Sequence, residues 1–159
     1  MDNTGEIKFK QWLEKNNIPY MYFDQNFDTY SSVFRGFARR PDFMLLLPNF
    51  GFILVDVETR NPHKIYSKYC LNIAETIKYS NLQRFFNLQV WYVISNEILN
   101  YDTWYWISVS SLLEKRLERF NENKPDRAFF ALEPNQFIQI SSNDSLSRLF
   151  ENIFMKKPK

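Results

Sequence analysis

The sequence predicts an α/β protein in which a mixed β-sheet lies between helices. Segments with helical periodicity alternate along the chain with short apolar runs that are typical of strands. One such run, residues 89–95, is almost continuously apolar, as in strands buried on both faces. With 159 residues, the chain is long enough for one core and too short for two. We therefore expect a single domain over residues 1–159.

The first half of the chain predicts a helix followed by three strands. Residues 5–16 carry an apolar stripe at helical spacing, and Asn3 or Thr4 precedes them as a possible cap. Residues 18–24 form a strand-like run, and a polar loop follows up to Phe34. Two apolar strands then fill residues 41–60, joined by a turn that contains Pro48, Asn49 and Gly51.

The second half predicts helices that alternate with strands. We expect a helix at residues 67–86, with Lys78 at the border of its apolar side, which consists of Cys70, Ile73, Ala74, Ile77, Leu82 and Phe85. The remaining expected elements are strands at 89–95 and 103–110, a helix at 111–120, a strand or strand pair at 131–141, and a closing helix at 144–154.

Composition excludes several classes of protein. Hydrophobic residues make up 45% and charged residues 24%, which argues against disorder. The net charge of +2 permits a phosphate-bearing partner without requiring one. The single cysteine, Cys70, excludes an internal disulfide and a cysteine zinc site and fits a reducing compartment. No apolar leader or spanning segment is evident, so we expect a cytoplasmic protein without a membrane partner.

Three carboxylates stand at defined places in the hairpin. Asp42 opens its first strand, while Asp56 and Glu58 lie near the end of the second, where strand alternation puts them on one face. Carboxylates beside the apolar run 52–55 are expensive to bury unless a positive charge offsets them. Hard oxygen ligands of this kind suit Mg²⁺ or Mn²⁺. The sequence therefore predicts a divalent metal site.

The run Arg39-Arg40-Pro41-Asp42-Phe43, followed by Gly51 and Val55-Asp56-Val57-Glu58-Thr59, resembles the signature of the PD-(D/E)XK nucleases. The order of the expected elements over about residues 5–95 is also similar to that of the family. The resemblance implies a restriction-endonuclease-like three-layer α/β/α fold with a central mixed sheet. It also implies a metal-dependent endonuclease that hydrolyses DNA phosphodiester bonds in restriction, recombination, repair or mobile-element biology, with RNA the less favoured substrate.

The resemblance also implies roles for individual residues. Asp42, Asp56 and the carbonyl of Val57 would hold a Mg²⁺ or Mn²⁺ ion. Glu6, the upstream acid on the first helix, would lie outside the metal's inner shell or at a second metal. The neighbouring arginines would meet DNA phosphates; these are Arg35, Arg39, Arg40 and Arg60.

One position departs from the family, because Glu58 stands where its lysine belongs. Glu58 would then act as a general base or a further metal ligand, with Lys78 reaching over from the following helix as the positive group. Lost catalysis is the alternative, which would leave a nucleic-acid or protein binding module. A shifted register, Glu58-Thr59-Arg60, offers arginine for lysine but leaves Asp56 without a role.

Plainer interpretations of the same residues stay open. Asp42 after Pro41 is also typical of a turn at a strand start, and Glu6 also suits the first turn of a helix. Lys78 also suits a helix boundary where its stem covers apolar surface. An unrelated α/β domain with a chance motif is a third hypothesis. Self-association as a homodimer, or a place in a larger complex, is compatible with the resemblance.

Overall fold

A six-stranded mixed sheet forms the centre of the protein. The computed structural model describes residues 4–64, 67–115, 117–119 and 128–150. The strand order is β1-β2-β3-β5-β6-β9, in which β3 and β5 are parallel and every other neighbouring pair is antiparallel. The strands are β1 (Tyr20–Tyr22), β2 (Phe43–Leu47), β3 (Gly51–Thr59), β5 (Val90–Ser95), β6 (Thr103–Ser108) and β9 (Ile138–Ser141).

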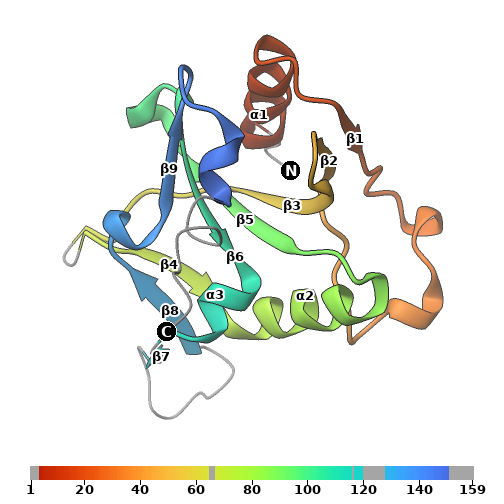
Figure 1. The fold of residues 1–159 in the computed structure, drawn as a ribbon. Coiled ribbons are helices and arrows are strands. Elements are labelled where there is room, and N and C mark those ends of the chain that lie inside the picture. The colour runs from red at the N-terminus through yellow and green to blue at the C-terminus, as the bar shows by residue number, and fades with distance from the viewer. Residues whose placement is uncertain (1–3, 65–66, 116, 120–127, 151–159) are drawn as a thin grey trace, which may run out of the picture.

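Helices cover both faces of this sheet. In Figure 1, α1 (Thr4–Lys15) lies above the sheet, while α2 (Ile73–Phe86) and the short α3 (Val109–Leu113) lie below it. A second sheet joins the lower layer, with the order β4 (Tyr69–Asn72), β8 (Ala128–Leu132) and β7 (Leu117–Arg119). The predicted three-layer α/β/α arrangement is therefore confirmed, with a small sheet added to one layer.

Aromatic side chains fill the core between α1 and the sheet. Phe9 is fully buried and contacts Trp104 edge to face, with ring centroids 4.9 Å apart. Trp12 of the same helix lies against Trp104 and Trp106. Such pairs add to the stabilisation that comes from their buried area. The predicted stripe on this helix is confirmed, because Phe9, Trp12 and Leu13 are all buried.

The predicted hairpin is also confirmed. β2 and β3 are antiparallel, with Phe43 opposite Val55. In the turn, Asn49 and Gly51 adopt positive φ values of 70° and 99°, a conformation that these residue types tolerate well. Extending the register by one residue sets Asp42 opposite Asp56. The hairpin therefore brings together two carboxylates, one from each of its strands.

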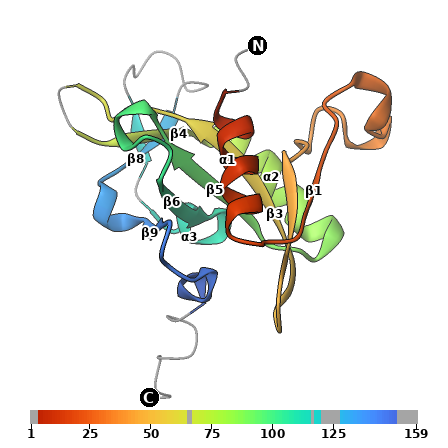
Figure 2. The ribbon, with the colours of Figure 1, turned by 90° about the horizontal axis from the view of Figure 1, so that it is seen from above.

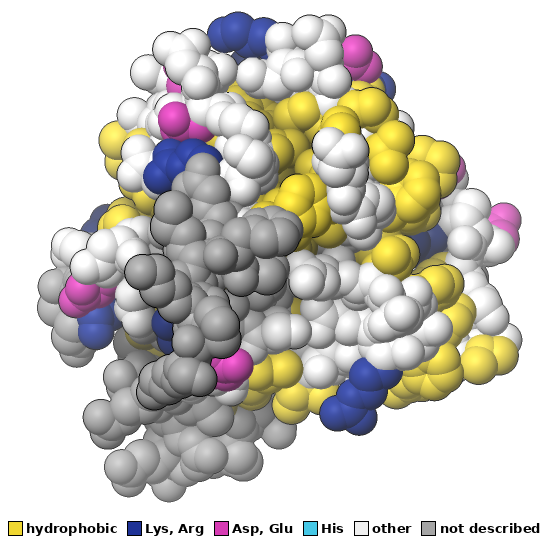
Figure 3. Space-filling model, in the orientation of Figure 1, with side chains coloured by type: hydrophobic (Ala, Val, Ile, Leu, Met, Phe, Trp, Pro, Cys, Tyr) yellow, Lys and Arg dark blue, Asp and Glu magenta, His cyan; other side chains and the backbone are white. Residues whose placement is uncertain are grey.

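The second predicted helix is correct over its main part and wrong at its start. Residues Tyr69–Asn72 pair with β8, and the helix begins at Ile73, with the Asn72 side chain accepting from the Glu75 N–H. Its buried residues are Thr76, Tyr79 and Leu82. The predicted apolar side is wrong in part: Leu82 is buried as predicted, but Ile77 and Phe85 of the same side are exposed. Figure 3 shows hydrophobic side chains at the surface over the end of α2.

The predictions for the C-terminal part need correction. Residues 111–120 are not one helix, since α3 ends at Leu113 and pairing with β8 draws residues 117–119 into β7. Residues 131–141 contribute to two strands of different sheets, β8 and β9. The closing helix is a 3-10 turn over Leu146–Leu149, and residues 151–154 lie outside the described ranges.

The segment between β1 and β2 projects beyond the edge of the sheet (Figure 2). It contains two 3-10 turns, Phe27–Thr29 and Ser32–Phe34, in place of the predicted plain loop. Among the helices of the described residues, none is long and apolar enough to cross a membrane.

Candidate active site

Two buried carboxylates lie side by side on the sheet face that α2 covers. Asp42 is 7% exposed and Asp56 is 3% exposed. The Val57 backbone N–H donates to Asp42 Oδ2 over 2.8 Å, and the Asp42 N–H donates to the Val55 carbonyl over 2.9 Å. The hairpin backbone therefore fixes Asp42 against the strand that carries Asp56.

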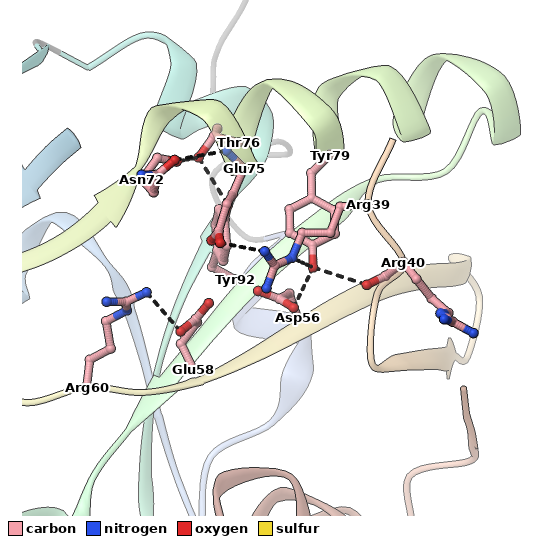
Figure 4. Close-up of polar contacts among 10 residues, drawn as sticks. All are labelled: Arg39, Arg40, Asp56, Glu58, Arg60, Asn72, Glu75, Thr76, Tyr79 and Tyr92. Carbon is pink, nitrogen blue, oxygen red and sulfur yellow. Dashed lines mark hydrogen bonds and ion pairs between the residues drawn. The ribbon is translucent and has the colours of Figure 1, made fainter. Parts of the chain in front are cut away.

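Side chains from α2 and from the loop before β2 form a series of polar contacts that holds Asp56 (Figure 4). The Tyr79 hydroxyl donates to Asp56 Oδ1 over 2.5 Å, and Arg39 Nε donates to the same hydroxyl over 3.2 Å. Arg39 Nη1 in turn pairs with Glu75 Oε1 at 2.5 Å. Glu75 and Tyr79 are four residues apart and share one face of α2. This geometry positions Asp56 and brings one guanidinium next to it.

The carboxylate pair carries more negative charge than its surroundings offset. Burial raises the pKa of Asp56 well above its ordinary value, and the charges of Asp42 and Glu58 raise it further. Burial also raises the pKa of Asp42 to about 6, although the Val57 N–H acts in the opposite direction. Asp56 Oδ2 is buried and has no hydrogen-bond partner among the described residues. Such an oxygen calls for a cation or a proton.

The donor set at this site suits Mg²⁺ or Mn²⁺. Within the described ranges, no three His, Cys, Asp or Glu side chains are grouped closely enough to hold a metal ion by themselves. Mg²⁺, however, commonly binds one or two carboxylates and keeps several waters. The unpartnered oxygen of Asp56 and the adjacent Asp42 meet that need, and the Val57 carbonyl is the next oxygen along the strand. A zinc site would need histidine or cysteine, which this site lacks.

Glu58 lies on the same face as Asp56, as strand alternation predicts. Its Oε2 is 3.1 Å from Arg60 Nη2, and its side chain is largely buried. The Glu58 carboxylate therefore already has a cationic partner, Arg60, which lies two residues further along the chain. Arg60 is half-buried, and its Nε has no hydrogen-bond partner among the described residues.

Glu6 approaches the pair from α1. Its Oε2 accepts from the Tyr22 hydroxyl over 2.6 Å, and this bond is the main reason that the pKa of Tyr22 rises to about 12. The charge of Glu6 also contributes to the raised pKa of Asp42. The first turn of α1 lies directly on β3, since a Cβ on Gly5 would come within 3 Å of Thr59 Oγ1. The structure thus brings Glu6 near Asp42 without a direct contact.

The other predicted site residues differ in how close they lie to the carboxylate pair. Lys78 is half-buried, next to Tyr79 on α2, and makes no ion pair with a described carboxylate. Arg40 points away from Asp56 (Figure 4) and donates to the carbonyls of Asp24 and Asn26. Its guanidinium also lies 5.0 Å from the ring centroid of Tyr30. Arg40 therefore anchors the projecting loop, whereas Arg39 lies at the site.

Sequence reasoning missed Tyr79 and Glu75. A tyrosine on a helix next to apolar positions usually indicates core, and Glu75 suits the first turn of a capped helix. Their spacing of four residues would have indicated a shared face, but the predicted apolar side of the helix was rotated away from it. The burial of Thr76 and Tyr79 identifies the correct face.

Comparison with known proteins gives a fold. No family model matches the chain, and no curated protein matches it. Among solved structures, it is similar to Hjc, a Holliday junction resolvase from Archaeoglobus fulgidus, with 14% identity, a TM-score of 0.52, and coverage of 82% of this chain and 94% of that one. A nuclease from a fusselovirus has 13% identity, a TM-score of 0.46, and coverage of 91% and 82%. The likeness to Hjc confirms the predicted fold, which is restriction-endonuclease-like.

Proposed function

We propose that this protein is a metal-dependent endonuclease that hydrolyses DNA phosphodiester bonds. The observation that carries the proposal is the buried Asp42–Asp56 pair, in which Asp56 Oδ2 has no hydrogen-bond partner within the described part of the chain and both pKa values are raised. A protein keeps such an arrangement at a stability cost, and perturbed carboxylates of this kind cluster at functional sites. The fold shared with a Holliday junction resolvase supports DNA as the substrate.

Each side chain at the site has a role in this proposal. Asp42, Asp56 and the Val57 carbonyl would hold Mg²⁺ or Mn²⁺, which when bound supplies Lewis-acid stabilisation and an acidified water. Tyr79 orients Asp56 through its hydrogen bond. Arg39, whose side chain is 41% exposed, keeps N–H groups available for a phosphate oxygen.

Glu58 and its neighbours complete the proposal. Glu58 would accept a proton from the attacking water, and Arg60, its ion-pair partner, would also meet a phosphate. Lys78 and Glu6 remain proposed contributors, the first as a cation from α2 and the second outside the metal's inner shell. Arg40 would act on DNA only through the loop that it anchors.

A second function is favoured by the Glu58–Arg60 ion pair. A carboxylate stands at the position of the family's lysine, and its charge is already balanced by Arg60 at 3.1 Å. A nuclease-like domain that has lost catalysis would need neither a general base nor a positive group there. In that case the protein binds nucleic acid or another protein without cutting.

Cleavage of plasmid and branched DNA with Mg²⁺ or Mn²⁺ separates the two functions. The comparison uses the natural chain, Asp42→Ala, Glu58→Lys, and the exposed control Asp102→Ala, each shown to be folded by circular dichroism. Metal-dependent cutting that is lost only in Asp42→Ala supports the endonuclease. Cutting that appears only in Glu58→Lys supports the binding module, and branched RNA tests the preference for DNA.

A further inference from the structure

A cavity of about 380 Å³ lies beside the carboxylate pair. Its wall includes Pro41, next to Asp42, and Leu54, two residues before Asp56 and thus about 7 Å along the strand. Leu82 and Phe86 of α2 form another side, and the projecting loop closes it through Tyr30 and Phe34. The cavity therefore lies next to the candidate active site along the hairpin, and its volume falls within the range of small-molecule sites.

Two polar atoms of the lining residues lack partners. The Tyr30 hydroxyl and Arg40 Nε are both buried without a hydrogen bond to any described residue. The other lining side chains are mostly apolar, so each unpartnered atom costs free energy. An N–H can only donate and a hydroxyl can donate or accept, so both atoms suit a ligand with hydrogen-bond acceptors on its edge.

Aromatic rings also line the cavity. The Tyr30 and Phe34 rings are stacked with centroids 5.6 Å apart, and Phe34 lies 5.6 Å from Phe86. Hydrophobic side chains continue onto the surface over the end of α2 (Figure 3), where Phe85 is 62% exposed. Flat apolar surfaces beside unpartnered donors match the faces and edge of a nucleobase.

We propose that this cavity receives an unpaired nucleobase of the DNA strand whose phosphate lies at Asp42 and Asp56. The inference rests on the proposed function and adds a substrate class, namely DNA with unpaired nucleotides at a branch, gap or bulge. A fully paired duplex keeps its bases stacked inside the helix, and extracting one requires unstacking energy. Arg39, which lies next to Asp56 with its side chain 41% exposed, supplies positive charge for the adjoining phosphate.

Fluorescence anisotropy tests this proposal with the full chain in Ca²⁺, so that binding is measured without cleavage. The probes are a duplex with a three-nucleotide bulge and the same duplex with abasic sites in the bulge. We expect the bulge with bases to bind about tenfold more tightly, the scale of one stacked base. 2-Aminopurine placed in the bulge should lose fluorescence on binding, because stacking quenches it.

Two variants locate the effect. Met44→Trp fills the cavity and should abolish the preference for bases, while Tyr30→Phe removes the unpartnered hydroxyl and should reduce it about threefold. Tyr30→Phe leaves the packing unchanged and so stays informative even if Met44→Trp misfolds. Tyr20→Phe, whose hydroxyl instead donates to Glu14 outside the cavity, should keep the full preference.

The outcomes distinguish the two proposals. Equal binding of both bulges, or a preference that survives both cavity variants, overturns the base cavity and leaves the endonuclease intact when plasmid cleavage persists. Absence of binding to every DNA, together with absence of cleavage, overturns the endonuclease and the cavity with it. A base preference reduced in Tyr30→Phe but kept in Tyr20→Phe supports the cavity.

Discussion

The two faces of strand β3 differ in what they contribute to the protein. Toward α1, Ile53 and Val55 are buried in a hydrophobic core rich in aromatic residues. Toward α2, Leu54 is followed by Asp56 and Glu58, which are surrounded by tyrosine, arginine and glutamate. One strand thus stabilises the fold through one face and holds uncompensated charge on the other. Packing on the apolar face of β3 therefore stabilises the strand that positions the carboxylates.

The largest expected effect lies on the apolar face. Phe9→Ala should lower the free energy of unfolding by about 3–5 kcal/mol, since it removes a fully buried ring that contacts Phe43 and Trp104. Urea denaturation measures the change. Ile7→Ala, at a 55% exposed position of the same helix, should change stability by less than about 0.5 kcal/mol. Equal losses in both variants would contradict the division between faces.

The charged face should respond with the opposite sign. Asp56→Asn keeps an acceptor for the Tyr79 hydroxyl and removes a buried charge, so it should raise the free energy of unfolding of the metal-free protein by about 3 kcal/mol at pH 8. Thermal denaturation checks this, with exposed Asp102→Asn as a control of equal charge change. A loss of stability in Asp56→Asn would mean that its charge is offset within the protein.

The same face predicts a pH and metal dependence. The folded pKa of Asp42 is about 6 against an ordinary 3.8, so the folded state binds more protons between these values. The free energy of unfolding should therefore fall as pH rises through this window. Above it, Mn²⁺ should raise the melting temperature of the natural chain and not that of Asp56→Asn. A melting temperature that ignores Mn²⁺ at pH 8 would count against the metal site.

A contact between α1 and the end of β3 tests how closely the two layers fit. Gly5→Ala places a Cβ where Thr59 Oγ1 now lies, and the overlap should destabilise the protein by about 1–3 kcal/mol. Thr59→Ala removes that oxygen, so the double variant should regain most of the loss. Urea denaturation of the four proteins gives the interaction energy. If the losses of stability in the two single variants add up in the double variant, the Cβ of Gly5→Ala does not overlap with Thr59.

The smallest expected effect concerns the outer part of the polar chain. Glu75→Gln removes the ion pair between Glu75 and Arg39, whose side chains are 32% and 41% exposed, respectively. The substitution should change the free energy of unfolding by less than about 1 kcal/mol. DNA cleavage should fall more than stability does if Arg39 needs Glu75 to stay next to Asp56. Equal DNA cleavage by Glu75→Gln and the natural chain would mean that Glu75 contributes to stability and not to cleavage.

The sequence alone predicts the carboxylate pair because the hairpin is local. Alternation in β3 and the turn around Asn49 determine which residues face each other, and both can be inferred over a short stretch. The α1 stripe and the buried strand β5 are predictable for the same reason, since their periodicity is complete within each element.

The rest depends on contacts between distant segments. Residues 69–72 and 117–119 become strands because each pairs with β8, which no local pattern indicates. Likewise, Tyr79 meets Asp56, and Arg40 meets the projecting loop, only after the layers pack. The carboxylates can therefore be predicted from the sequence, whereas the residues that contact them cannot.

The parallel pairing of β3 with β5 has a consequence for folding kinetics. The hairpin joins Asp42 and Asp56 through a short loop, whereas β5 reaches β3 only after the chain has passed through β4 and α2. Local pairings form faster than distant ones. We therefore expect the two carboxylates to meet before Tyr79 packs against them, and their repulsion to slow the folding arm of a chevron plot as pH rises, with less effect on the unfolding arm.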